Sequence, residues 1–161
     1  MISLFIIIGA AILLFAGAFV SKRRLGLLGL ALTAGATLST LWSYEAGLVV
    51  SATGLLPEGP VSQAVTQSLV VLLPATLLLF HGNSYKSVLP RILGSLVFTV
   101  LALAFLAEPM GYALVLEGAS VDVHKLLLDY KGLIISIGVS LAVLDLFFTK
   151  PASVSENKRK R

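Results

Sequence analysis

The feature that most constrains this chain is a series of long stretches without charged side chains. From Ile2 to Val20 the sequence contains no acidic or basic residue, and Lys22-Arg23-Arg24 follows soon after. About 20 apolar residues in a helix span the roughly 30 Å hydrocarbon core of a bilayer. Charged residues make up only 12% of the chain and hydrophobic residues 57%, whereas soluble domains average about 25% charged residues. The sequence therefore predicts an all-α integral membrane protein.

Five stretches of this kind predict a bundle of about five transmembrane helices in one domain, residues 1–150. The predicted spans cover residues 2–20, 25–50, 61–80, 88–107 and 132–149. Glu108-Pro109 is expected to end the fourth span, because proline disrupts a helix interior. The segment 119–131 includes "VDVHKLLLDYK". This pattern predicts a short amphipathic helix that either lies at the membrane interface or extends the last span outward.

The basic residues fall mostly on one side of these five spans. Basic residues near span ends favour the cytoplasmic side. Lys125 and Lys131 fall on the opposite side. The remaining basic residues share the predicted inner side: Lys22, Arg23, Arg24, Lys86, Arg91, Lys150, Lys158, Arg159, Lys160 and Arg161. We therefore predict an outer N-terminus, an inner C-terminus and a disordered basic cytoplasmic tail at 151–161, and we expect this inner face to contact anionic lipid headgroups.

Small residues recur at every fourth position in two of the predicted spans, and so lie on one helix face. In the second span they are Ala31, Gly35, Ser39, Ser43 and Gly47, and in the last span they are Gly132, Ser136 and Ser140. One interpretation is close helix packing, between these two spans or between copies of the chain. The other is a polar strip that lines a pore, helped by Thr33, Thr37 and Thr40. Packing is favoured, because hydroxyls within spans often bond to their own backbone.

Two residues interrupt the apolar spans. Pro74 is expected to kink the third span, as prolines do both in transporter sites and in ordinary packing bends. Asp145 is a lone carboxylate in "GVSLAVLDLFFTK", five residues before Lys150 and so about 7 Å from the inner boundary. We expect it to pair with Arg91, because Pro90 indicates a helix start whose positive end favours a carboxylate. The alternative is a protonated acid available for proton relay.

Motifs that carry catalytic or metal chemistry are missing from the sequence. The chain contains no cysteine, no HExxH pattern, no Gly-rich phosphate loop and no G-x-S-x-G elbow. His81 and His124 fall on opposite predicted sides. We therefore expect no enzyme activity, no cofactor and no metal. The terminal "KRKR" is interpreted as a lipid-facing tail, so no nucleic acid is expected.

The chain resembles the colicin V production protein family in its length, in the basic turn after the first span and in "RILG", Arg91 to Gly94. Members of that family often continue with a glycine four residues later and carry an acid before the arginine. Phe98 and Pro90 occupy these positions here. The resemblance implies a multi-pass protein of the bacterial inner membrane with a role in envelope function or toxin secretion and no established catalytic site.

These observations predict a small non-catalytic membrane protein that assembles with itself or with another envelope or secretion component. The alternative is a small transporter or channel for an ion, a proton or a small solute. That activity would use Asp145 and the polar face of the second span.

Overall fold

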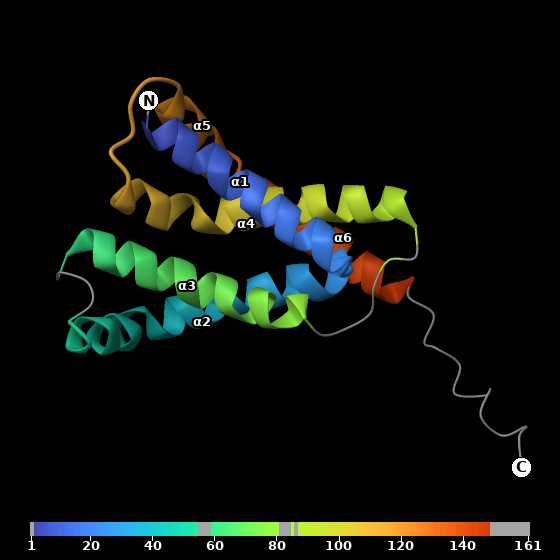
Figure 1. Cartoon of the computed structure of the whole chain (residues 1–161), viewed down its shortest axis with the longest axis horizontal. Helices are drawn as coiled ribbons and strands as arrows, with labels where there is room; N and C mark the ends of the chain where they lie inside the picture. The colour runs from blue at the N-terminus through green and yellow to red at the C-terminus, as the bar shows by residue number, and fades with distance from the viewer. Residues whose placement is uncertain (1, 55–58, 81–84, 86, 149–161) are drawn as a thin grey trace, which may run out of the picture.

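The computed structural model describes residues 2–54, 59–80, 85 and 87–148, apart from the side chain of Ser43. Within these residues the fold is entirely helical, as predicted (Figure 1). The helices are α1 (Ile2–Ser21), α2 (Leu25–Ala52), α3 (Pro60–Leu79), α4 (Val88–Ala113), α5 (Ala119–Asp129) and α6 (Lys131–Phe147). The predicted tail at 151–161 and the last two residues of the domain, 149 and 150, lie outside the described residues.

Four of the helices, α1 to α4, are long and apolar enough to cross a membrane. The pair α5 and α6 meets the same length and composition criteria only when it is taken as one broken segment, and its two halves are bent by 61°. Tyr130 is the residue between them. Within the segment 119–131, residues 119–129 therefore form a separate helix at a steep angle to α6, and not a straight extension of the last predicted span.

The fourth helix runs beyond the end that the sequence predicts. Glu108 and Pro109 were expected to end it, but α4 continues through both to Ala113. A proline inside a helix removes one backbone donor and strains the preceding turn. Here that turn is held from outside, because His124 of α5 forms a 2.8 Å hydrogen bond with the carbonyl of Ala107. Tertiary contact with α5 thus supports a helix end that local preference would have placed earlier.

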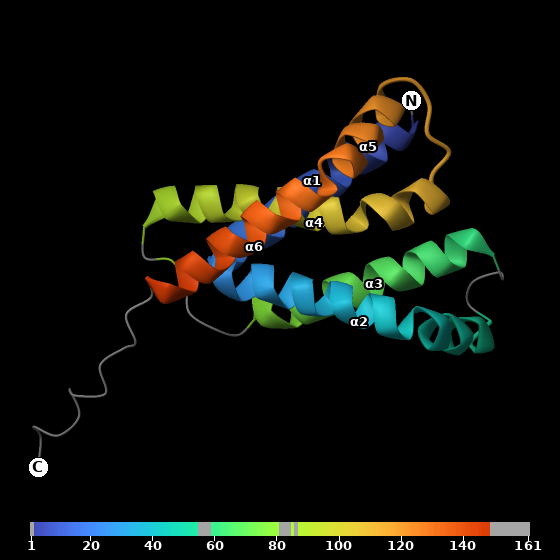
Figure 2. The ribbon, with the colours of Figure 1, turned by 180° about the vertical axis from the view of Figure 1, so that it is seen from behind.

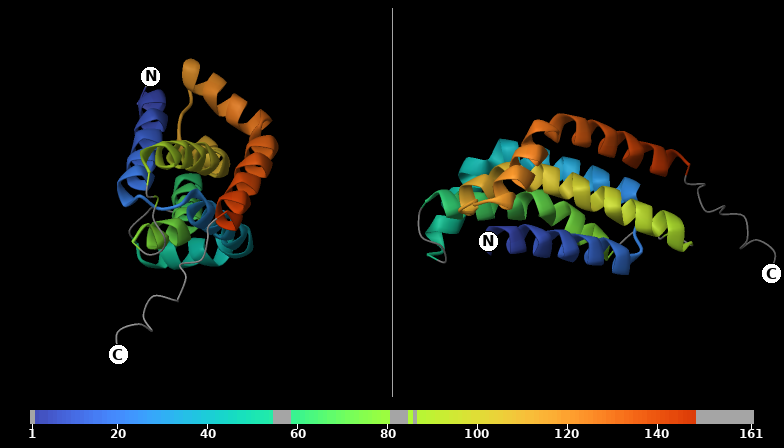
Figure 3. Two further views of the ribbon diagram at one scale, coloured as in Figure 1. Left: turned by 90° about the vertical axis from the view of Figure 1, so that its right-hand side faces the viewer. Right: turned by 90° about the horizontal axis from the view of Figure 1, so that it is seen from above.

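The helices pack as a bundle around α4. Figure 1 shows α2 and α3 running side by side, and among the described helices these two make the most extensive contact. Seen from behind in Figure 2, α6 crosses the bundle, where it packs against α2 and α4. The end-on view in Figure 3 shows α1 and α6 on opposite sides of α4. The fourth helix therefore lies between the first and the last helix and contacts both of them.

The core lies where α2 and α4 meet. Leu28, Leu32 and Leu101 are fully buried, and Ala102 and Ala142 fill the space around them. Many large apolar side chains remain on the outside of the bundle, including Phe5 and Leu13, which are 71% and 73% exposed. The buried alanines allow the helix backbones to approach closely where they meet, and the leucines fill the remaining core.

The connection between α1 and α2 is short and held tightly. Lys22 has a φ of 58°, which is uncommon for a residue other than glycine. Its carbonyl accepts a 2.8 Å hydrogen bond from the backbone N–H of Tyr85, in the α3–α4 connection. Arg23 donates from Nε to the carbonyl of Leu79 (3.0 Å) and from Nη2 to that of Phe80 (2.8 Å), at the end of α3. This turn therefore gathers three segments at one end of the bundle.

Candidate functional site

Asp145 lies near the end of α6 and reaches the first turn of α2. Its Oδ2 accepts a hydrogen bond from the backbone N–H of Gly26 over 2.9 Å. The neighbouring N–H of Leu25 donates to the hydroxyl of Tyr85 over 3.0 Å. The first backbone N–H groups of a helix have no partner inside that helix, and Arg24, at the N-cap position, gives no side-chain cap. Asp145 and Tyr85 therefore cap α2 from distant parts of the chain.

Gly26 allows this contact because it has no side chain. A Cβ at this position would lie 2.5 Å from Cγ of Leu146 and 2.6 Å from the carbonyl oxygen of Ala142. Any larger residue would push α6 away from α2 and withdraw Asp145 from the helix end. The positive end of the α2 dipole adds a favourable field for the carboxylate.

Tyr85 links this cap to the basic turn. Its hydroxyl hydrogen-bonds to the Asp145 side chain, and the Arg24 guanidinium lies 5.7 Å from the centre of its ring. Burial raises the pKa of Tyr85 above its ordinary value of 10.0, and the charge of Asp145 acts in the same direction. The N–H of Leu25 and the charge of Arg24 oppose this shift. The cluster therefore favours the protonated phenol.

Arg91, expected to pair with Asp145, has its contacts on α1. Its Nε donates to the carbonyl oxygen of Phe19 over 2.5 Å, and its guanidinium carbon lies 3.8 Å from the centre of the Phe19 ring. A cation over an aromatic face adds to that hydrogen bond. The two residues thus have different partners: Arg91 joins α4 to the end of α1, and Asp145 joins α6 to the start of α2. Asp145 does lie at the N-terminal end of a helix, as the sequence predicts, but that helix is α2 and not α4.

The sequence contains a signal that the start of α2 needs a partner such as Asp145. "RRLG", Arg23 to Gly26, begins a helix without Ser, Thr, Asp or Asn at the N-cap position, although these residues usually satisfy the first N–H groups. A buried helix start of this kind needs an acceptor from elsewhere in the fold. Asp145 is the carboxylate that comes within reach.

The small-residue stripe of α2 packs against α3 along part of its length. A Cβ on Gly35 would lie 2.1 Å from the carbonyl oxygen of Val71, so the two backbones nearly touch. Ala31 and Ser39 are buried on the same face. Gly47, toward the end of α2, has no heavy atom within 4 Å of its would-be Cβ. Close packing against α3 is therefore found around Gly35 and not along the whole stripe.

The stripe of α6 lies on the outside of the bundle. Ser136 and Ser140 are exposed, and their hydroxyls donate to the carbonyls of Gly132 (2.8 Å) and Ser136 (2.7 Å) within the same helix. A Cβ on Gly132 would meet nothing within 4 Å. The expected contact between the two stripes is therefore not formed. Instead α6 meets α2 through Ala142, whose Cβ would lie 2.8 Å from a Cβ on Gly29.

The hydroxyl groups that were proposed to line a pore bond to the backbone of their own helix, and the helix that contains Pro74 is unbroken. Thr33 and Thr37 each donate over 2.9 Å to a backbone carbonyl one turn earlier in α2, and Thr40 donates to the carbonyl of Thr37 over 2.7 Å. Pro74 is half-buried inside α3, which continues on both sides of it from Pro60 to Leu79.

A cavity of about 460 Å³ lies between α2, α3, α4 and α6, and we name it the four-helix cavity. Its polar lining consists of Ser39, Thr40, Gln67, Glu108 and Lys131. Lys131 Nζ and Glu108 Oε1 form an ion pair over 2.7 Å. The sequence interpretation assigned Ser39 to packing and did not bring the other four together, because they are far apart in the chain. Only the helix arrangement joins them.

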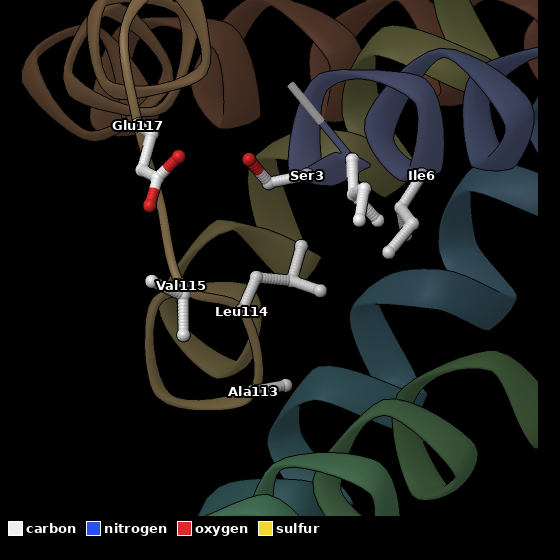
Figure 4. A pocket seen from close by; sticks show the side chains of 7 residues that line it. Ser3, Ile6, Ala113, Leu114, Val115 and Glu117 are labelled. Carbon is white, nitrogen blue, oxygen red and sulfur yellow. The ribbon is translucent and has the colours of Figure 1, made fainter.

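A second pocket, of about 310 Å³, lies where α1 meets the α4–α5 connection. Figure 4 shows Ser3 and Glu117 on one side of it, with Leu114 and Val115 nearby. The buried hydroxyl of Ser3 lies 2.9 Å from that of Ser120, which also donates to the carbonyl of Glu117 over 2.8 Å. These polar groups satisfy one another, so this pocket mainly marks the docking of α5 on α1.

Among the described residues, no three His, Asp or Glu side chains gather as a metal site. Comparisons with protein-family models, with curated proteins and with solved structures found no significant match. The resemblance to the colicin V production protein family therefore stays a prediction.

Proposed function

We propose that this chain is a five-span integral membrane protein that is not an enzyme and that assembles with copies of itself. The support for membrane insertion is the apolar exterior of the long helices. On α1 and α3, Ile12, Leu13 and Leu77 are more than 60% exposed. Exposure of this apolar surface to water would cost a large amount of free energy, whereas lipid tails would cover it favourably.

The proposed orientation has the N-terminus outside and the C-terminus inside, in the plasma membrane of a bacterium. Its support is the charge at the two ends of the bundle. Lys22, Arg23 and Arg24 belong to the α1–α2 turn, and Glu117 and Asp122 belong to the opposite end, with α5 (Figure 1). Basic residues beside spans favour the cytoplasmic side. Anionic lipid headgroups are the proposed partners of that side.

The observation that carries the assembly proposal is the uncovered stripe on α6. Gly132, Ser136 and Ser140 form a shallow surface on which a second α6 helix can approach closely, as small residues permit in membranes. Their hydroxyls are already bonded within the helix, so packing a second helix here leaves no donor unsatisfied. We propose that two copies meet through this face. Another envelope or secretion component with a similar small-residue face would fit it in the same way.

Cysteine crosslinking in native membranes tests this assembly, because the chain contains no cysteine of its own. Ser140→Cys should give a disulfide-linked dimer under mild oxidation, while Thr76→Cys, exposed on α3, serves as the control and should stay monomeric. Adding Ser136→Leu to Ser140→Cys should reduce the dimer, since the larger side chain separates the helices. Equal crosslinking at positions 140 and 76 would contradict an α6 interface.

Transport is the second candidate, and it has less support. The side chain proposed for proton or ion relay, Asp145, accepts a backbone hydrogen bond at a helix end. The hydroxyls of Thr33 and Thr37 bond within α2. We expect flux through proteoliposomes to stay at background across a panel of ions and small solutes. Flux that disappears in Asp145→Asn would reverse the order of the two candidates.

A further inference from the structure

We propose that the four-helix cavity binds a small amphiphile of zero net charge that carries one cationic and one anionic group beside an apolar body. The cavity combines a buried hydroxyl, an amide, an ion pair and an apolar floor. This inference concerns a different surface from the α6 stripe and does not rest on assembly.

Ser39 is the first observation that points to a ligand. It is only 8% exposed, and it lines the cavity. Thr33 and Thr37 on the same helix bond to carbonyls one turn earlier, whereas the Ser39 hydroxyl makes no hydrogen bond with the described part of the chain. The Oγ of Ser39 is not one of the fully enclosed side-chain atoms that lack a partner, so it is open to the cavity, and polar groups in a largely buried site usually find a partner. A ligand in the cavity supplies one.

Gln67 provides further hydrogen-bonding groups on the α3 side. It is half-buried and lines the same cavity. A glutamine amide offers two donor hydrogens and one acceptor oxygen, and a serine hydroxyl can donate and accept. Together, Ser39 and Gln67 suit an uncharged polar group such as an ester, or one oxygen of an anionic group.

The ion pair sets the charge of the ligand. Lys131 and Glu108 are 2.7 Å apart, and their side chains are 25% and 63% exposed. Glu108 is therefore the more accessible charge, and Lys131 the more enclosed. A ligand with both charges can replace this ion pair by two new ones, with its cationic group bound to Glu108 and its anionic group bound to Lys131. A ligand with a single charge would leave one protein charge without its partner, and that loss costs more for the enclosed Lys131 than for Glu108, which is 63% exposed.

The apolar floor sets the body of the ligand. Val71 is buried and Phe105 and Ile135 are half-buried around the cavity. Its volume of about 460 Å³ lies within the range of roughly 300–1,000 Å³ that is usual for ligand pockets. This chemistry is shared by the headgroup region of a zwitterionic phospholipid and by a free apolar amino acid.

A single thiol placed in the cavity tests the proposal. Ser39→Cys is the only cysteine in its variant, and the rate of its reaction with a small maleimide is measured on the full chain in detergent. Phosphatidylethanolamine, phosphatidylglycerol or leucine is added to separate samples. We expect at least about five-fold slower modification with phosphatidylethanolamine or with leucine, and no protection by phosphatidylglycerol. Thr37→Cys, exposed two residues away on α2, should react at one rate throughout.

The ion pair and the hydroxyl each have a test of their own. Adding Glu108→Gln and Lys131→Gln together to Ser39→Cys replaces the ion pair by two uncharged amides. This change should abolish the protection of the thiol from maleimide. Native mass spectrometry of the unmodified chain should show the bound amphiphile, and Ser39→Ala should bind it about five-fold more weakly, as expected for one lost hydrogen bond. This measurement does not depend on the folding of the cysteine variant.

Protection by the phospholipid alone or by leucine alone supports the site and identifies the source of its ligand. Lack of protection by both would overturn the proposal, and so would equal protection by the anionic lipid or protection that survives the double Gln variant. These outcomes are independent of crosslinking at Ser140→Cys. Failure of the ligand site and failure of the assembly proposal can therefore be told apart.

Discussion

Asp145 near the end of α6 accepts a hydrogen bond from the backbone N–H of Gly26, in the first turn of α2, over 2.9 Å. The contact joins two helices that are far apart in sequence. It also gives an acceptor to an N–H group that its own helix cannot satisfy. The carboxylate that stands out in an apolar sequence is therefore a helix cap.

This role predicts a graded response to substitution. Asp145→Ala removes the acceptor and should lower the free energy of unfolding by about 1–3 kcal/mol, the cost of an unsatisfied buried donor. Asp145→Asn keeps an acceptor oxygen and loses mainly the charge at the helix end, about 0.3–1 kcal/mol. Denaturant unfolding in detergent measures both. Equal losses in the two variants would show that the charge matters and the hydrogen bond does not.

The two glycines of the α2 stripe should respond in opposite ways to alanine. Gly35→Ala brings a methyl group to 2.1 Å from the carbonyl oxygen of Val71, so α2 and α3 must separate, at a cost of at least about 1–3 kcal/mol. Gly47→Ala meets nothing within 4 Å and should stabilise the helix by up to about 1 kcal/mol. Thermal unfolding of the two variants compares them directly. A stable Gly35→Ala protein would contradict the close α2–α3 contact.

Tyr85 should make stability depend on alkaline pH. Because burial raises its pKa above 10.0 in the folded protein, the unfolded chain loses this proton first as pH rises. The folded state then binds more protons than the unfolded state, and stability falls as pH increases above 10. Below that pH the contribution is fully present. Unfolding midpoints followed from neutral to alkaline pH should fall less steeply in Tyr85→Phe.

A direct titration gives the control for this effect. The tyrosinate absorbance of the native chain, compared with that of Tyr85→Phe, isolates one phenol among the four tyrosines. The difference should titrate above pH 10. A difference that titrates below pH 10 would remove the basis of the prediction.

The end of α4 should depend on His124. Gly111 leaves room for its ring, since a Cβ there would lie 2.9 Å from Nε2. Gly111→Ala should displace His124 from the carbonyl of Ala107 and loosen the turns around Pro109. We expect faster amide hydrogen exchange at residues 110–114, with His124→Phe giving the same change. Unchanged exchange in both variants would mean that α4 holds its last turns without α5.

The proposed five-span topology predicts which residues face each side of the membrane. Single cysteines at Thr53 and Gly118 should react with an impermeant maleimide added outside intact cells, and one at Ser87 should react only after the cells are opened. These positions lie at the α2–α3 end, in the α4–α5 connection and just before α4. Labelling of Ser87→Cys from outside would contradict the proposed orientation.

The sequence by itself determined the helical class and the extent of most helices. Long uncharged stretches leave few alternatives, because an unbroken apolar run must satisfy its backbone polar groups internally as a helix. Thus α1, α2 and α3 begin and end close to the predicted residues, at charges, prolines and glycines. The fourth helix departs from this rule, because it continues through Glu108 and Pro109, beside the hydrogen bond between His124 of α5 and the carbonyl of Ala107.

Which faces meet was decided only by the tertiary structure. Periodicity identifies a face, but it does not say what covers that face. The stripe of α2 packs on α3, and the equivalent stripe of α6 stays exposed. Likewise, Asp145 was recognised from sequence as the unusual residue, but its partner follows from how closely Gly26 lets α6 approach α2. A hydrogen bond needs its two groups within about 3 Å, and between residues this far apart only the packing of the helices sets that distance.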